Sequence, residues 1–407
     1  MSLSTAQLIT IAEDYGSPVY IYDAATIEQQ YQKLTSAFQN CNAKFFYACK
    51  ALSNINILQL IHNIGSNLDC VSINEVQLGL KAGFTPQQII FTPNCVDFSE
   101  IEAAKELGVH INIDNMSILE QFGNKFGNSY PVCIRINPHI MAGGNMKIST
   151  GHIDSKFGIS IHQLRHIQRV VKSTGLVVHG LHMHTGSEIK DIEVFIRSLD
   201  ILLDIAHDFP NLIFLDLGSG FKVPYQDGDY STDLVTLARR VKETFDAFEA
   251  EYKRTFEIWF EPGKFLVSES GTLVVKANVV KQTTATTFVG VNSGFNHLIR
   301  PMFYDAYHKI SNLSAPDGPE RIYTVVGHLC ETDTFAWDRK INEVHEGDYL
   351  AFHNTGAYGF EMSSSFNSRC RPAEVLVYQG KSHLIREREE FKDLLHKQVE
   401  CNIFNKI

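Results

Sequence analysis

The sequence has no apolar run that approaches the roughly 18 residues of a membrane-spanning helix, and Met1–Thr5 does not begin a signal peptide. It has no C-x-x-C pair, and its eight cysteines are scattered over 407 residues. Even cysteine counts indicate disulfides in small secreted chains, a class to which this chain does not belong. We therefore expect a cytoplasmic protein with reduced thiols, most of them packed as small apolar side chains and at most one or two active in chemistry.

Basic charge is in deficit as well. The chain has 36 Lys and Arg against 46 Asp and Glu, a formal net charge of −10. This balance argues against a nucleic acid or an anionic membrane as partner, because both require a basic surface. The hydrophobic fraction of 44% and charged fraction of 20% are those of a globular protein and exclude disorder as the main state. The length allows two domains, or one large barrel with an appendage.

Short β-rich segments alternate with amphipathic helical segments from residue 24 to residue 267. This alternation predicts a parallel sheet, and eight units over ~240 residues favour a (β/α)8 TIM-like barrel over a doubly wound open sheet. The expected strands are Phe45–Cys49, Leu68–Ser72, Ile89–Thr92, His110–Asp114, Val132–Asn137, Val177–His184, Ile213–Leu217 and Glu257–Glu261. Helices are expected at Ile55–Ile64, Glu100–Leu107, His162–Val171, Val194–Ala206 and Leu234–Tyr252.

The pattern changes after residue 267. Gly271–Val291 is rich in Thr and Val and has no helical period, and further strand-like segments follow at Ile322–Val326, Tyr349–Phe352 and Ala373–Tyr378. These features predict a C-terminal antiparallel β domain at residues 268–407. We expect the strand-like Val19–Tyr22, within residues 1–23, to join it.

Residues at the C-terminal ends of barrel strands are the ones expected to carry chemistry. Lys50, His184 and Glu261 follow three of the expected strands, and Gly218-Ser219-Gly220 follows a fourth. Each has a simpler interpretation: a solvated strand end, a rim carboxylate, or a tight turn. His182 and His184 could also form a metal pair, but no further His/Asp cluster is evident, so we expect no metal.

One lysine, a glycine loop that can hold phosphate, a flat imidazole and one isolated carboxylate together match the requirements of pyridoxal 5'-phosphate. The lysine would form a Schiff base, and an ionised carboxylate beside the ring nitrogen would favour its protonated form. A protonated ring is a strong electron sink, suited to the carbanion that loss of CO2 leaves behind.

The sequence resembles the alanine-racemase-fold amino-acid decarboxylases from about residue 15 to residue 380. The motifs that carry the resemblance are Tyr47-Ala48-Cys49-Lys50-Ala51, His182-Met183-His184-Thr185-Gly186-Ser187, Glu261-Pro262-Gly263 and Cys330-Glu331. Further matches are Arg135-Ile136-Asn137-Pro138, Ser155-Lys156-Phe157-Gly158, Leu298-Ile299-Arg300-Pro301, Gly356-Ala357-Tyr358, Asn367-Ser368-Arg369 and Arg371-Pro372-Ala373-Glu374-Val375-Leu376. All of them occur in the order found in the family.

The resemblance implies a role for each matching position. Lys50 and Cys330 would be catalytic, Cys330 acting as a general acid supplied by the second subunit of a homodimer with shared active sites. The cofactor would be held by Lys50, His184, Ser187, Gly220, Glu261, Pro262, Gly263, Lys264 and Tyr358. The substrate would be held by Lys264, Arg300, Tyr304, Glu331 and Tyr358. A buried, inert Cys330 is the alternative, and we disfavour it because its neighbours Glu331 and Asp333 are unusual core residues.

Three positions depart from the family pattern. Lys264 stands where the family usually has Arg, so a bidentate grip becomes a point charge. Ser219 places a side chain inside the glycine triplet, although both outer glycines are kept. Asp333 follows Cys330 one residue earlier than is usual, which leaves its role open.

The implied activity is that of a lyase of lysine biosynthesis, which decarboxylates meso-2,6-diaminopimelate to L-lysine and CO2 in the last step of that pathway. The alternatives are a related decarboxylase acting on another diamino acid such as carboxynorspermidine, and a catalytically silent relative that binds a cofactor or partner. A metal-dependent barrel hydrolase is a more distant alternative. The motifs define the cofactor more firmly than the substrate.

Overall fold

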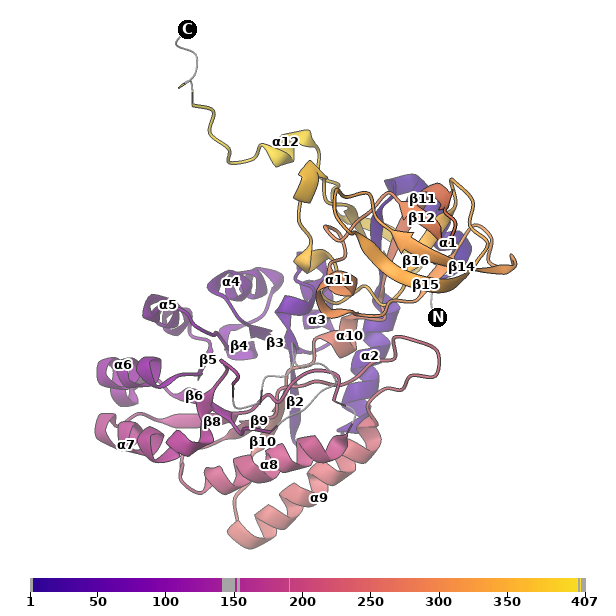
Figure 1. Ribbon diagram of the computed structural model, residues 1–407. Helices are drawn as coiled ribbons and strands as arrows, with labels where there is room; N and C mark the ends of the chain where they lie inside the picture. The colour runs from indigo at the N-terminus through magenta and orange to yellow at the C-terminus, as the bar shows by residue number, and fades with distance from the viewer. Residues whose placement is uncertain (1–2, 141–150, 152–153, 190, 402, 404–407) are drawn as a thin grey trace. The chain divides into compact units, whose positions relative to one another are not determined.

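The computed structural model describes residues 3–140, 151, 154–189, 191–401 and 403. The chain forms two compact units (Figure 1). One is Ala25–Glu269, and the other combines Met1–Ala24 with Ser270–Ile407. In the part of the chain just given, no helix combines the length and the apolar character that crossing a bilayer requires.

The unit Ala25–Glu269 is a closed parallel barrel, as predicted. Its strands follow the order β5-β4-β3-β2-β10-β9-β8-β6, and the pairing of β5 with β6 closes the ring. The barrel strands are β2 (Ala43–Ala48), β3 (Asn67–Cys70), β4 (Ile89–Phe91), β5 (His110–Ile113), β6 (Val132–Asn137), β8 (Val178–His182), β9 (Phe214–Asp216) and β10 (Glu257–Phe260). A two-residue strand, β7 (Ile159–Ser160), pairs with β6.

Helices connect these strands, most of them amphipathic as expected from the sequence. They are α2 (Ala24–Ala37), α3 (Ile55–Asn63), α4 (Ile73–Ala82), α5 (Phe98–Leu107), α6 (Met116–Phe126), α7 (Leu164–Thr174), α8 (Ile192–Ala206), α9 (Leu234–Tyr252) and the short α10 (Lys264–Val267). Asp and Ser side chains accept hydrogen bonds from the first backbone N–H groups of several of them, for example Asp233 at α9.

The inside of the barrel has an apolar layer below a polar one. Buried Phe46, Ile90, Cys133, Phe214 and Trp259 form the apolar cluster. Strand side chains alternate, so the residues two positions further along point to the same interior, closer to the C-terminal rim. These include Arg135, Asp216 and Glu261, all buried. The barrel interior therefore changes from apolar side chains to charged side chains toward the C-terminal ends of the strands.

The second unit is built on a mixed sheet, which corrects the expectation of a purely antiparallel domain. Its strand order is β15-β14-β12-β11-β1-β17-β18, with β16 paired to β11 and β13. Two of its pairings, β1 with β17 and β12 with β14, are parallel. The strands are β1 (Val19–Asp23), β11 (Gly271–Gln282), β12 (Thr287–Val291), β13 (Ile310–Asn312), β14 (Glu320–Val326), β15 (Thr334–Asn342), β16 (Tyr349–Phe352), β17 (Ala373–Tyr378) and β18 (Lys381–Arg386).

The N-terminal strand β1 lies inside this sheet, between β11 and β17. All five of its residues are buried, which is typical of a strand covered on both faces and consistent with its parallel partner. Helix α1 (Thr5–Tyr15) contributes Leu8 and Ile11 to the same apolar cluster as Val19 and Ile21. Two short helices, α11 (Arg300–Tyr304) and α12 (Phe391–Leu394), complete the unit.

Candidate active site

Lys50 lies in a 3-10 turn, Cys49–Ala51, immediately after β2. Its Nζ donates a hydrogen bond to Oδ2 of Asp69, on β3, at 3.0 Å. The lysine side chain is 43% exposed, whereas that of Asp69 is fully buried. Burial and the nearby Glu261 raise the pKa of Asp69 to about 7, against the opposing effect of Lys50. Lys50 is thus an accessible amine at the rim, next to a carboxyl able to exchange its proton near neutral pH.

Glu261 follows β10 and lies among buried polar groups. Its Oε2 is 3.2 Å from Nε2 of His182. Asp216 completes a group of three, in which one ring nitrogen of His182 and one carboxylate oxygen each of Asp216 and Glu261 all lie within 4.8 Å of one another. Burial would raise the pKa of Glu261, but His182 and Lys50 outweigh it and hold that pKa below its usual range. Burial, and then Glu261, raises the pKa of Asp216 well above its usual value.

This cluster corrects the expectation that no further acidic group accompanies His182. The carboxylates that join His182 are Asp216 and Glu261, from neighbouring strands, and His184 is not part of the group. Because His182 and Glu261 already bond to each other, we interpret the cluster as a hydrogen-bonded network. Asp216 was missed in the sequence, although an Asp two residues before a Gly-x-Gly turn in an apolar strand is an available signal.

His184 is fixed by the glycine loop that follows β9. The backbone N–H of Ser219 donates to His184 Nδ1 at 3.2 Å, so the ring's own proton lies on Nε2. Burial, followed by the charge of Arg135, lowers the pKa of His184 to about 3. Gly218 has a φ of +60°, and a Cβ there would lie 2.6 Å from Nδ1. The result is a neutral, flat ring held in one orientation.

The loops after β8 and β9 run side by side at the rim. The backbone N–H of Ile189 donates to the carbonyl of Gly220 at 2.9 Å. Gly220 has a φ of +114°, and a Cβ there would lie 2.4 Å from the carbonyl oxygen of Gly186. Half-buried Ser187 lies in the first loop, and the Ser219 side chain is buried in the second. Only glycine allows this close approach of the two loop backbones, and glycine-rich turns of this kind are typical of phosphate sites.

The loop after β10 brings Pro262, Gly263 and Lys264 next to β2. The backbone N–H of Ala48 donates to the carbonyl of Pro262 at 3.2 Å, and a Cβ on Gly263 would lie 3.0 Å from that of Ala48. Lys264 is buried, and its Nζ donates to Glu188 Oε1 at 2.8 Å. Glu188 was not among the predicted residues, and its pairing with Lys264 joins the loops after β8 and β10.

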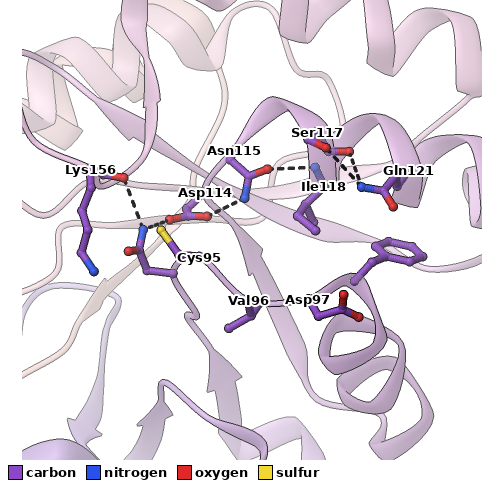
Figure 2. A pocket seen from close by; sticks show the side chains of 11 residues that line it. Cys95, Val96, Asp97, Asp114, Asn115, Ser117, Ile118, Gln121 and Lys156 are labelled. Carbon is purple, nitrogen blue, oxygen red and sulfur yellow. Dashed lines mark hydrogen bonds between the residues drawn. The ribbon is translucent and has the colours of Figure 1, made fainter.

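A polar pocket of about 440 Å³ opens elsewhere on this unit, where β4 and β5 end and α5 and α6 begin (Figure 2). Asn115 donates to Oδ1 of Asp114 at 3.0 Å, and Asn94 donates to Oδ2 of the same carboxylate and, at 3.3 Å, to the carbonyl of Lys156. Its described lining includes exposed Cys95 but none of the predicted site residues. The pocket was not anticipated from the sequence.

In the second unit, Arg300 brings together three of the predicted residues. It is buried at the start of α11, and its guanidinium carbon lies 6.0 Å from the ring centre of Tyr304 and 5.9 Å from that of Tyr358. Tyr358 has a φ of +57°, a conformation that is uncommon for a tyrosine. The three side chains form one cationic, aromatic group.

Cys330 and Glu331 are both exposed, as a reactive position requires. The backbone N–H of Cys330 donates to Oδ1 of Asn367 at 2.8 Å. The expectation that Asp333 is not a core residue is wrong, because it is 4% exposed. Its carboxylate accepts the backbone N–H groups of Phe295 and Leu329, at 2.7 and 3.1 Å.

Asp333 therefore holds the loop that carries Cys330. A Cβ on Gly327 would lie 1.9 Å from its Oδ2, so the loop closes directly on the carboxylate. Burial raises the pKa of Asp333 in spite of the two backbone donors. All eight cysteines are free thiols, but only Cys49, Cys70 and Cys133 are buried, so the expectation that most of them pack in the core is wrong.

Comparison with known proteins identifies the class first. Residues 24–268 match the family model described as "Pyridoxal-dependent decarboxylase, pyridoxal binding domain", which covers the whole barrel. A barrel rim with a lysine, a neutral histidine, glycine turns and a buried carboxylate agrees with this class of pyridoxal-dependent enzymes.

Similar proteins then indicate which family within this class the chain belongs to. The chain is 37% identical, over 403 residues, to the diaminopimelate decarboxylase of Methanothermobacter thermautotrophicus, covering 97% of this chain and 94% of the relative. The crystal structure of the Helicobacter pylori diaminopimelate decarboxylase complexed with L-lysine is 32% identical, with a TM-score of 0.87 and coverage of 96% and 98%. That from M. jannaschii, in co-complex with L-lysine, is 30% identical, with a TM-score of 0.89 and coverage of 97% and 95%. The chain belongs to the diaminopimelate decarboxylase family.

Proposed function

We propose that this chain removes one carboxyl group of meso-2,6-diaminopimelate as CO2 and releases L-lysine, the last step of lysine biosynthesis. The observation that carries the proposal is the arrangement of Lys50, His184 and Glu261 on one barrel rim, in a chain of the diaminopimelate decarboxylase family. It is a pyridoxal-dependent carboxy-lyase, as its family membership states.

The rim has the groups that pyridoxal 5'-phosphate requires. Lys50 is accessible for a covalent link, the His184 ring is neutral and fixed, and Glu261 is an ionised, buried carboxylate suited to the ring nitrogen. Ser187, Gly220 and Gly263, with Tyr358, would hold the phosphate, and Pro262 and Lys264 would complete the contacts. When bound, the cofactor supplies an electron-withdrawing ring that stabilises the negative charge left by CO2.

Lys50 can attack a carbonyl carbon only as the neutral amine. Asp69 Oδ2 already accepts its hydrogen bond at 3.0 Å, and the pKa of Asp69 is raised to about 7, so this carboxylate can take the proton. We therefore assign Asp69 the removal of a proton from Lys50 Nζ. This residue is an addition to the set expected from the sequence.

The substrate's second amino-acid end would be held by charge. Arg300 would clamp the distal carboxylate, Glu331 the distal ammonium, and Tyr304 and Tyr358 would flank them. Because Lys264 is paired with Glu188, Arg300 is the principal cation of this clamp. Sites that bind charged groups reject analogues without them strongly, so lysine and ornithine would be poor substrates.

We further propose a cytoplasmic homodimer in which Cys330 of one subunit serves the active site that contains Lys50 of the other. Its thiol would donate a proton to the carbon that has lost CO2. Support comes from the motif resemblance and from the exposure of Cys330 and Glu331 on a loop fixed by Asp333.

The direct test is to incubate purified protein and pyridoxal 5'-phosphate with meso-diaminopimelate and to quantify L-lysine and CO2. Carboxynorspermidine, L-lysine and L-ornithine serve as competing substrates under the same conditions. We expect equimolar lysine and CO2 from meso-diaminopimelate and little turnover of the others. Preferential turnover of carboxynorspermidine would replace the proposed substrate, and absence of turnover with all of them would refute decarboxylation.

A further inference from the structure

Two buried carboxyl groups lie side by side beneath the rim of the barrel. Asp216 ends β9 and is 0% exposed, and Glu261 follows the adjacent β10 and is 7% exposed. The backbone N–H of Glu261 donates to the carbonyl of Gly218 at 2.7 Å, which fixes the two strand ends against each other. The backbones that carry the two carboxyl groups are therefore held next to each other by the sheet.

Each carboxyl group has one satisfied oxygen and one without a donor. Asp216 Oδ1 accepts the backbone N–H of Gly218 at 2.8 Å, and Glu261 Oε2 lies 3.2 Å from His182 Nε2. Within the described residues, no donor reaches Asp216 Oδ2 or Glu261 Oε1. Two adjacent buried acceptors without donors are costly, and one proton shared between them satisfies both.

The charged groups around Asp216 and Glu261 also favour one proton shared between the two carboxyl groups. The titratable groups that face this pair from the surrounding strands are Asp69, Cys133, Arg135 and His182, with Lys50 and His184 at the strand ends. Both imidazoles are neutral at pH 7, since burial lowers the pKa of each. When Lys50 is an ammonium, three buried carboxyl groups face it and the Arg135 guanidinium, so a proton on one of these carboxyl groups reduces the excess of negative charge.

Asp216 is the better holder of this proton. Glu261 is stabilised as an anion by its hydrogen bond to His182 and by the charge of Lys50. Among the described residues, the hydrogen-bond donor to Asp216 is the uncharged backbone N–H of Gly218. Burial and the neighbouring Glu261 raise its pKa, in agreement with this geometry.

We propose that Asp216 is a neutral carboxylic acid that donates a hydrogen bond from Oδ2 to Glu261 Oε1 and positions Glu261 for the cofactor ring. The inference rests on the proposed role of Glu261. Through Gly218, Asp216 also holds the loop whose Ser219 N–H contacts His184. One protonated side chain thus connects the ring-nitrogen partner, the glycine loop and the stacking imidazole.

The test compares Asp216→Asn with Asp216→Leu. Asparagine is neutral, and its amide can donate to Glu261 while its oxygen accepts from Gly218, whereas leucine has similar bulk and neither group. Infrared difference spectra of the cofactor-free protein, between wild type and each variant at neutral pH, should show that the C=O stretch of a protonated carboxyl group, the Asp216 band, disappears in Asp216→Asn and remains in Asp69→Asn. Asp69→Asn is the control, because Asp69 is itself partly protonated near pH 7.

Cofactor affinity, measured by titrating pyridoxal 5'-phosphate without substrate, is the second readout. Asp216→Asn should bind within a few-fold of wild type, and Asp216→Leu at least about tenfold more weakly. A wild-type spectrum without the band, a band that persists in Asp216→Asn, or equal loss of affinity in both variants would overturn the proposal. If Asp216→Leu does not fold, the infrared comparison still decides.

These readouts are independent of the proposed reaction. Neither uses diaminopimelate, so failure to decarboxylate it would leave them unchanged. If Glu261 does not contact the ring, Glu261→Gln should leave the absorption spectrum of the bound cofactor unaltered while the Asp216 band is still present in the wild type.

Discussion

Lys264 Nζ donates a hydrogen bond to Glu188 Oε1 at 2.8 Å, and Lys264 is only 8% exposed. This lysine, at which the resemblance predicted a departure from the usual arginine, is thus already paired within its own barrel. Lysine offers three donors on one nitrogen, whereas arginine has a planar fork that can bind two partners at once. The pair explains how a point charge remains buried at this position, and it bears directly on how a substrate carboxylate would be held.

Lys264→Arg should therefore keep the contact with Glu188 and add a donor toward substrate. We expect unchanged affinity for pyridoxal 5'-phosphate and an equal or lower KM for meso-diaminopimelate, measured by lysine release. Glu188→Gln is the matched variant, which frees Lys264 of its anionic partner and should also lower KM. Normal cofactor binding with complete loss of substrate binding in Lys264→Arg would show that this chain has built a different pocket.

Lys50→Ala should abolish the covalent link between cofactor and protein. Lys50 is 43% exposed at the end of a barrel strand, in the position expected for a Schiff-base lysine. The wild type should be yellow and become irreversibly labelled on borohydride reduction, as judged by mass spectrometry of the intact chain. A variant that still carried a reducible link would identify another lysine as the attachment site.

Asp69→Asn tests the proton acceptor of Lys50. An amide cannot take a proton from the ammonium, so formation of the covalent link should slow and shift to higher pH, where the free amine predominates. Stopped-flow absorbance over a range of pH measures both effects. A rate and pH profile equal to those of wild type would remove Asp69 from this step.

Glu261→Gln should retain the cofactor but lose most of the decarboxylation rate. The neutral amide no longer favours the protonated ring nitrogen, and a charge-assisted contact of this kind is worth about 2–4 kcal/mol of barrier, or roughly 30- to 1,000-fold. The turnover number and the absorption spectrum should be measured together. Near-normal turnover with a filled site would contradict the electron-sink argument.

Asp333→Ala should destabilise the loop that carries Cys330. The buried carboxylate accepts two backbone N–H groups, and leaving them without an acceptor costs about 1–3 kcal/mol. The free energy of unfolding in urea measures the loss, with exposed Asp317→Asn as control. An equal free energy of unfolding for the two variants would show that water replaces the Asp333 carboxylate as acceptor without loss of stability.

Mixing two inactive variants tests the shared site. Lys50→Ala and Cys330→Ala homodimers should each be nearly inactive. After joint unfolding and refolding in equal amounts, about half of the dimers should be heterodimers by random pairing, each with one intact site, so about a quarter of wild-type activity should return. If Cys330 serves its own subunit, every site carries one lesion and no activity returns.

The sequence by itself determined the barrel fold and which residues follow its strands at the rim. Alternating apolar segments placed all eight barrel strands close to their observed bounds, because burial on both faces leaves a continuous apolar signal that is local in sequence. Lys50, His184, the Gly218–Gly220 turn and Glu261 were recognisable because strand ends in a barrel share one rim. Strand β15 was missed because it is an edge strand in which polar residues interrupt the apolar pattern, and three of its nine residues, Trp337, Asp338 and Lys340, are exposed.

Only the tertiary structure decided which of these groups pair. Lys50 meets Asp69, Lys264 meets Glu188, and Asp216 lies against Glu261 because the closed ring of strands brings residues far apart in sequence to adjacent positions. The same holds for Asp333, which is buried only because Gly294 and Gly327 leave room for its carboxylate. Side-chain pairing depends on distances across strands, and the periodicity of a single strand carries no information about them.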